Sequence, residues 1–210
     1  MVQTGVAEKT GNHAITPNKA DMSNTIKIIS TPFTEDVARW LRVGDSVLLS
    51  GIILTGRDAA HRRLVELLDN GAELPVELRD QIIFYVGPTP APPGRPIGSA
   101  GPTTAGRMDI YAPRLIAECG LRGMIGKGAR NATVREACSS YGAVYFGAIG
   151  GLGAVLGNCI TAAEIVAYPE LGPEAIYRLT VRDFPLLVVN DCHGGDAYEM
   201  GRAQWARDPL

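Results

Sequence analysis

The sequence predicts one α/β domain over residues 25–210, preceded by a polar leader over residues 1–24 that we expect to be disordered. Short apolar runs rich in Val, Ile and Leu alternate with segments whose apolar residues recur at helical spacing, and this rhythm is typical of α/β domains. The 25 glycines and 14 prolines are scattered between these runs rather than gathered in low-complexity tracts. They indicate tight turns and close backbone approaches.

The predicted strands are short aliphatic runs bounded by turn residues. They cover residues 26–30, 46–54, 82–86, 123–126 and 143–149. Residues 175–181 and 186–190 are expected to form an antiparallel pair around Asp183, Phe184 and Pro185, and residues 165–168 to join the same sheet.

The predicted helices follow these strands. They cover residues 35–41, 59–68, 133–139 and 152–160, and another runs from the end of segment 101–109 to about Glu118. Thr34 and Asp58 are the expected N-caps of the first two, since their side-chain oxygens can accept from free amide groups. Pro113 must lie in the first turn of the later helix or break it, because proline has no N–H group.

Composition argues against several classes of partner. A net charge of −2 gives no reason to expect nucleic acid or an anionic membrane surface. Residues 142–163 carry no charge, but their glycines favour a buried strand, a turn and a helix over a membrane span. The four cysteines form no C-x-x-C pair, so we expect free thiols in a cytoplasmic protein that itself binds no metal.

Residues 101–109, Gly-Pro-Thr-Thr-Ala-Gly-Arg-Met-Asp, combine several anion-binding features in one loop. Gly101 and Gly106 let backbone amides approach a ligand, Thr103 and its neighbour supply hydroxyls, and Arg107 can bind a carboxylate through two nitrogens. A helix beginning nearby would add its N-terminal amides. A merely capped helix start needs fewer of these features, so we predict a site for a small carboxylate.

Two more cations follow predicted strands, each with glycine beside it. Arg57 comes after strand 46–54, and Lys127 comes after strand 123–126. Open α/β sheets collect ligands at the carboxyl ends of their strands, so we expect Arg57, Arg107 and Lys127 to meet there. Three cations would balance the two charges of a dicarboxylate.

Four stretches of the chain resemble the C-terminal, or β, part of iron–sulfur (class I) fumarate hydratase. They are LTGRDAAHRRL at 54–64, GPTTAGRMD at 101–109, MIGKGAR at 124–130 and YPELGPEAIY at 168–177. The resemblance implies a swivelling β/β/α three-layer domain that interconverts (S)-malate and fumarate plus water. It also implies a partner α subunit that holds a [4Fe–4S] cluster, while this chain holds none.

The same resemblance assigns roles to four residues. Arg57, Arg107 and Lys127 match the cations that bind the substrate carboxylates. Thr103 matches a substrate-binding residue proposed as the base that removes a proton beside a carboxylate. A threonine hydroxyl is a very weak acid, so its alkoxide would need strong stabilisation by neighbouring cations or amides.

Alternatives remain open at this point. His193 in Asp-Cys-His-Gly and the triplet at 61–63 are similar to the β subunit of L-tartrate dehydratase, and a dicarboxylate-binding module without catalysis is a further reading. His61 and His193 are candidates for acid–base chemistry. Alternatively, His61 only supports the site residues from behind, and His193 only belongs to a turn. An isolated β chain would expose an apolar face meant for its partner, so we also expect self-association.

Overall fold

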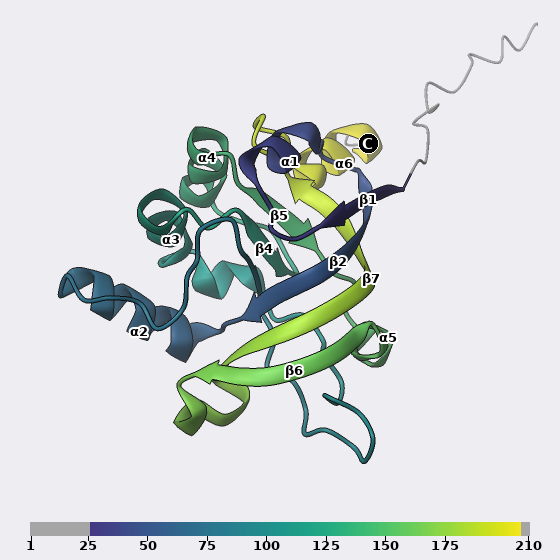
Figure 1. Cartoon of the computed structure of the whole chain (residues 1–210). Coiled ribbons are helices and arrows are strands. Elements are labelled where there is room, and N and C mark those ends of the chain that lie inside the picture. Colours follow the sequence, from purple (N-terminus) through teal and green to yellow (C-terminus); the bar gives the residue numbers. More distant parts are fainter. Residues whose placement is uncertain (1–25, 207–210) are drawn as a thin grey trace, which may run out of the picture.

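A computed structural model describes residues 26–206 of the chain (Figure 1). The predicted leader over residues 1–24 lies outside the described residues. Within them, seven strands and six α-helices alternate along the chain, so the predicted α/β class is confirmed.

Most predicted elements appear within a few residues of their expected bounds. The strands are β1 (Lys27–Ser30), β2 (Ser46–Thr55), β3 (Ile82–Phe84), β4 (Gly123–Gly126), β5 (Val144–Gly147), β6 (Ile160–Ala167) and β7 (Ile176–Asn190). The α-helices are α1 (Glu35–Trp40), α2 (Asp58–Asp69), α3 (Ala112–Cys119), α4 (Ala132–Tyr141), α5 (Gly153–Asn158) and α6 (Ala197–Trp205). Two 3-10 turns cover Ala105–Met108 and Pro169–Glu174. Pro113 lies in the first turn of α3, where a missing N–H group breaks no helical bond.

The sheet closes on itself. Its strand order is β1-β2-β3-β4-β5-β7-β6, and β2 also pairs with β7. Strands β1 to β5 run parallel, whereas β7 is antiparallel to β2, β5 and β6. The first half of β7 lies between β6 and β2, and its second half lies between β5 and β2. Strand β7 therefore connects the far side of the parallel sheet back to β2.

Two apolar cores lie on the two faces of the central strands. Along β3, Ile82 and Phe84 belong to the first core and Ile83 to the second, because successive strand side chains point to opposite faces. The first core fills the space enclosed by the strands, where the Phe84 and Phe184 rings meet edge to face at 5.4 Å. The second core lies beneath α2, α3 and α4, which cover one side of the sheet (Figure 1).

The C-terminal part of the sheet differs from the prediction. Residues 175–181 and 186–190 do not pair with each other, because both belong to the single long strand β7. Asp183 adopts a left-handed conformation with a φ of 49°, which bends the strand without reversing it. The helix expected to reach residue 160 ends at Asn158, and β6 begins at Ile160, five residues before the expected start. Pairing with β7 outweighs the local sequence preference there.

The uncharged stretch 142–163 forms β5, a turn, α5 and the beginning of β6. Its glycines interrupt the apolar run, as the sequence predicted. Among residues 26–206, no helix has both the length and the apolar character needed to cross a membrane.

Candidate active site

Strands β2, β3, β4 and β5 are parallel neighbours, so their carboxyl ends meet at one edge of the sheet. Backbone hydrogen bonds bring segment 101–109 to the same edge. Thr103 N donates to Tyr85 O at 2.7 Å, Lys127 N donates to Thr103 O at 3.1 Å, and Ala105 N donates to Lys127 O at 2.8 Å. Thr103 and Lys127 therefore lie side by side, although 24 positions separate them in the sequence.

Gly126 makes this close approach possible. A Cβ at this position would lie 3.0 Å from the Ala105 Cβ and 3.0 Å from Cδ2 of Tyr85. Any side chain would therefore push segment 101–109 away from β4. The α-helix expected near this segment begins only at Ala112, after the 3-10 turn at Ala105–Met108. Consequently, α-helix N-terminal amides are not placed at the threonines.

Arg107 lies on the 3-10 turn and faces Asp58. Arg107 Nε donates to Asp58 Oδ1 at 2.9 Å, and its Nη2 lies 2.8 Å from Asp58 Oδ2. The predicted N-cap role of Asp58 is wrong, because Arg57 occupies the N-cap position and Asp58 begins the helix. The Arg107 side chain is half exposed, so this pair is worth about 0–1 kcal/mol and an incoming carboxylate can compete for it.

Arg57 lies between β2 and α2, partly covered by the turn at Pro169–Glu174. Its Nη2 is 3.5 Å from Glu174 Oε1, and Glu174 Oε2 accepts from Ala59 N at 3.0 Å. Glu174 therefore caps α2 from a distant segment, in place of the predicted Asp58. A Cβ at Gly87 would lie 2.7 Å from Arg57 Nη1, so the glycine keeps room for the guanidinium.

Lys127 is exposed, and none of the ion pairs among residues 26–206 includes it. It follows β4 directly, and Gly128 after it has a φ of 83°. A left-handed glycine lets the chain turn sharply beside the strand end. Lys127 thus presents an uncompensated positive charge beside Thr103, whereas Arg57 and Arg107 each face a carboxylate.

A buried ion pair connects two of the sequence motifs. Arg130 ends the motif 124–130 and Asp109 ends the motif 101–109, and Arg130 Nε donates to Asp109 Oδ1 at 2.6 Å. Asp109 Oδ2 accepts from Asn131 N at 2.7 Å, and Arg130 Nη1 lies 3.3 Å from the Tyr85 hydroxyl. Burial opposes the charge of Arg130, but Tyr85 and Asp109 outweigh it and raise the pKa of the guanidinium. This buried pair therefore joins the segment that contains Thr103 to the turn that contains Lys127.

The two candidate histidines are placed differently. His61 is fully buried on the first turns of α2, and its Nδ1 lies 2.9 Å from Arg57 O. Burial lowers the pKa of His61 to about 4. His193 follows β7, whose end pairs with Tyr145 near the start of β5, so it lies at the opposite edge of the sheet. There Asp191 Oδ1 accepts from His193 N at 2.9 Å, which explains this segment as a structural turn.

The described residues do not fit a metal ion or cluster. All four cysteines are free, and burial raises the pKa of Cys138 to about 12. Within residues 26–206, no group of three His, Cys, Asp or Glu side chains converges as metal ligands require. An iron–sulfur cluster would need thiolates supplied from elsewhere.

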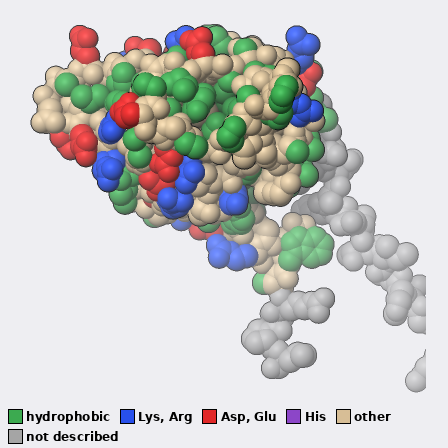
Figure 2. All heavy atoms as spheres, turned by 90° about the horizontal axis from the view of Figure 1, so that it is seen from below, with side chains coloured by type: hydrophobic (Ala, Val, Ile, Leu, Met, Phe, Trp, Pro, Cys, Tyr) green, Lys and Arg blue, Asp and Glu red, His purple; other side chains and the backbone are tan. Residues whose placement is uncertain are grey.

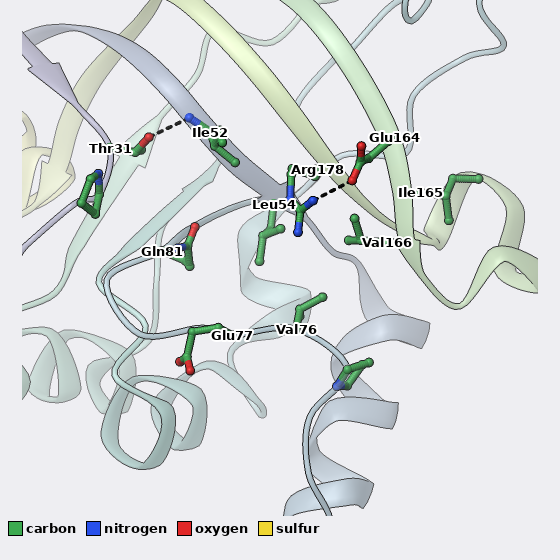
Figure 3. A pocket seen from close by; sticks show the side chains of 12 residues that line it. Thr31, Ile52, Leu54, Val76, Glu77, Gln81, Glu164, Ile165, Val166 and Arg178 are labelled. Atoms are coloured by element: carbon green, nitrogen blue, oxygen red, sulfur yellow. Dashed lines mark hydrogen bonds and ion pairs between the residues drawn. The ribbon is translucent and has the colours of Figure 1, made fainter.

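Figure 3 shows a hollow of about 790 Å³. It is bounded by β2, β6, β7 and the loop before β3, and Arg178 in its wall pairs with Glu164 at 2.6 Å. Because none of Arg57, Thr103, Arg107 and Lys127 lines it, its volume does not make it the candidate site.

Apolar surface lies close to the candidate site. Figure 2 shows the molecule from below, where green side chains occupy much of the middle of the face and charged side chains lie mostly toward its edges. Ile149, Leu152 and Val155 are among the exposed apolar residues of the turn after β5 and of α5. A Cβ at Gly150 would lie 3.7 Å from Lys127 Cδ, so this turn adjoins the lysine.

Sequence reasoning missed the partners of the site residues. Glu174 lies within the motif 168–177, and Tyr85 lies near the end of the predicted strand 82–86. The sequence did not predict a contact of either residue with the site. Tyr85 uses its carbonyl for Thr103, its hydroxyl for Arg130 and its ring for His61. Tyr85 could have been predicted as a site neighbour, because it stands at the carboxyl end of a buried strand.

The chain is similar to known proteins along most of its length. The family model described as Fumarase C-terminus matches residues 4–201. The chain is 43% identical over 185 residues to the anaerobic class I fumarate hydratase of Escherichia coli K12, a match that covers 86% of this chain and 34% of the relative. Fumarate hydratase 2 of Leishmania major is 41% identical over 157 residues, or 74% of this chain and 28% of that protein.

A shorter relative matches along most of its own length. The putative L(+)-tartrate dehydratase subunit beta of Methanocaldococcus jannaschii is 36% identical over 171 residues, which cover 79% of this chain and 88% of the relative. By contrast, the chain spans about a third of the length of the fumarate hydratases. The family resemblance read from the four motifs is thereby confirmed.

Proposed function

The chain belongs to the Fumarase C-terminus family, and we propose that it is the β subunit of an iron–sulfur hydro-lyase that interconverts (S)-malate and fumarate plus water. The observation that carries the proposal is the hydrogen bond from Lys127 N to Thr103 O, beside the bridge between Thr104 and Lys127, at the strand edge that Arg57 and Arg107 also adjoin. A relative of similar length named as a beta subunit supports a separate subunit of this size.

We assign substrate binding to Arg57, Thr103, Arg107 and Lys127. Arg57 pairs with Glu174, and Arg107 pairs with Asp58. Both ion pairs are partly exposed, so substrate carboxylates can replace these acids at a modest cost in free energy. Lys127 needs no such exchange. The charge of Lys127 favours a dicarboxylate over a neutral hydroxy compound, and the arginines provide two-point recognition of each carboxylate.

Thr103 is the residue we assign as the base. In malate dehydration its deprotonated Oγ1 would take the proton from the carbon next to a carboxylate, and the electron pair left on that carbon would form the double bond as hydroxide departs from the adjacent carbon. The neighbouring Lys127 charge stabilises both the alkoxide and the enolate-like carboxylate. Groups of the partner would complete the step by protonating the departing hydroxide.

A cofactor and a partner subunit are part of the proposal. We propose that a partner α subunit holds the [4Fe–4S] cluster, because residues 26–206 offer no converging set of three ligands. When bound, the cluster would supply a Lewis acid for the substrate hydroxyl. The apolar surface beside Lys127 supports docking of this subunit over the site.

The architecture and location complete the proposal. We assign a swivelling β/β/α three-layer domain, supported by the two cores on the two faces of β3 and by the helices over one of them. Four free thiols suit a reducing compartment such as the cytoplasm.

The second candidate is the β subunit of L-tartrate dehydratase, which the match to the M. jannaschii protein favours. Both reactions dehydrate a hydroxy-diacid, so the same cations would serve either one. A dicarboxylate-binding module without catalysis is the alternative from another class.

One reconstitution experiment separates these readings. The chain is combined with its cognate α subunit, iron and sulfide are restored without oxygen, and dehydration of (S)-malate and of L-tartrate is followed in parallel. We expect fumarate from malate at a rate well above that from tartrate. A reversed preference would support tartrate dehydratase. Malate binding by this chain without turnover in any complex would support the binding module.

A further inference from the structure

His61 has the surroundings of a positioning residue. Its side chain is fully buried, and Arg57 O accepts two hydrogen bonds from it, one from its backbone N and one from its ring Nδ1, both at 2.9 Å. A carbonyl oxygen can only accept, so Nδ1 carries the proton. Nε2 is buried and has no hydrogen-bond partner among the described residues.

The imidazole is neutral at physiological pH. Burial is the main reason that its pKa falls to about 4, the charge of Arg130 lowers it further, and the hydrogen bond to Arg57 and the charge of Asp58 act in the opposite direction. A neutral ring adds no charge to a site rich in cations. Its contribution is therefore the placement of its neighbours rather than attraction of an anion.

The ring is enclosed tightly on two sides. A Cβ at Gly56 would lie 3.1 Å from Cε1 of His61, so the glycine backbone packs against the imidazole. On another side the Tyr85 ring meets it edge to face at 5.3 Å between centroids. Tyr85 O in turn accepts from Thr103 N. The buried imidazole of His61 thus contacts both the Arg57 backbone and Tyr85, the residue that binds the Thr103 backbone.

We propose that His61, through the Nδ1 proton donated to Arg57 O, fixes the Arg57 main chain so that its guanidinium is aimed at a substrate carboxylate. The inference rests on the proposed hydro-lyase function for its catalytic consequence. It makes no use of proton transfer by His61 itself. Loss of the hydrogen bond should therefore weaken substrate binding more than it slows the chemical step.

Leu and Asn have nearly the same shape, and only Asn keeps a donor three bonds from Cα, at the place of Nδ1. In the reconstituted complex, His61→Leu should raise KM for malate by about tenfold or more and change kcat by less than about threefold. His61→Asn should restore KM to within about threefold of the wild type. Equal KM values in the two variants, or a loss confined to kcat, would overturn the proposal.

A second measurement needs no activity. Long-range nitrogen–proton spectra of the chain should show the His61 ring as a neutral Nδ1–H tautomer between pH 6 and 8. The Arg57 Nε–H signal should move in His61→Leu and stay near its wild-type position in His61→Asn. An Nε2–H tautomer, a charged ring or an unmoved Arg57 signal would refute the positioning role. If the wild-type complex dehydrates no hydroxy-diacid, the proposed function fails, and these spectra still decide the placement of Arg57.

Discussion

Thr103 is held at the strand edge by its backbone. Its N–H and C=O groups bond to Tyr85 and Lys127, and no hydrogen bond of its hydroxyl is present among residues 26–206. The side chain is therefore free for another task. Its removal should leave the local structure unchanged, which makes a substitution there informative about chemistry.

Thr103→Ala should lower kcat for malate dehydration by about a hundredfold or more, because loss of a general base costs two to four orders of magnitude. KM should change by only a few fold. Steady-state kinetics of the reconstituted complex measure both values. Thr103→Ser keeps a hydroxyl and serves as the matched control, which should retain most of the turnover. Near-normal turnover in Thr103→Ala would show that another group is the base.

Arg107 offers a two-point contact that Asp58 occupies in this structure. Arg107→Ala should raise KM for malate by about ten- to a hundredfold, since a charge-assisted hydrogen bond contributes about 1.5–3 kcal/mol. The effect on kcat should be smaller. Arg114→Ala is the control, because Arg114 also pairs with acids, Asp69 and Glu118, but lies on α3. Equal KM values for the two variants would exclude Arg107 from substrate binding.

One buried ion pair joins the segments that precede α3 and α4. The Arg130 side chain is completely buried and the Asp109 side chain is 7% exposed, and together they tie the loop before α3 to the turn before α4. A buried charge that loses its partner is strongly unfavourable, whereas replacing both by apolar groups is often neutral. The pair therefore specifies how these loops meet more than it adds to stability.

Arg130→Met should lower the free energy of unfolding by about 3–5 kcal/mol, because Asp109 would stay buried without its partner. Denaturant titration of the isolated chain measures this change. Arg178→Met is the matched control, since the Arg178 and Glu164 side chains are 49% and 61% exposed, and it should cost no more than about 1 kcal/mol. The double change Arg130→Met with Asp109→Leu should recover part of the loss. Similar losses in both single variants would contradict the buried-pair argument.

An apolar groove lies next to the turn after β5, which adjoins Lys127, although none of Arg57, Thr103, Arg107 and Lys127 lines it. This groove of about 320 Å³ is lined by residues of β2, β5, β7 and α5, and Leu187 and Ile149 in its wall are 42% and 68% exposed. Exposed apolar patches of this kind mark contact surfaces. The expected self-association of the isolated chain stays a prediction.

Sedimentation velocity over a range of concentrations tests this prediction. The wild-type chain should form dimers or larger species, and Ile149→Lys should weaken the association by at least about tenfold, because a charge would be buried in the contact. Ile165→Lys is the control, since Ile165 is 46% exposed on β6 and lines the other hollow. A monodisperse monomer at high concentration would contradict self-association.

Much of the local structure was predictable because it depends on neighbouring residues. Helical spacing and β-branched runs marked most elements, and glycine beside Arg57 and Lys127 marked the turns after β2 and β4. The mistaken antiparallel pair shows where this reasoning stops. Whether residues 176–190 turn back or continue depends on β2, β5 and β6, which lie beside both edges of β7.

The α/β class, the family and the cations that follow the strands were all predictable from the amino-acid sequence. Three contacts became evident only in the folded chain: Arg107 faces Asp58, Glu174 caps α2 beside Arg57, and Arg130 holds Asp109. They differ from the predictable features in the sequence distance over which they act. Periodicity and turn chemistry act within a few residues, whereas these contacts join segments that meet only after the sheet has closed and the helices have packed on it.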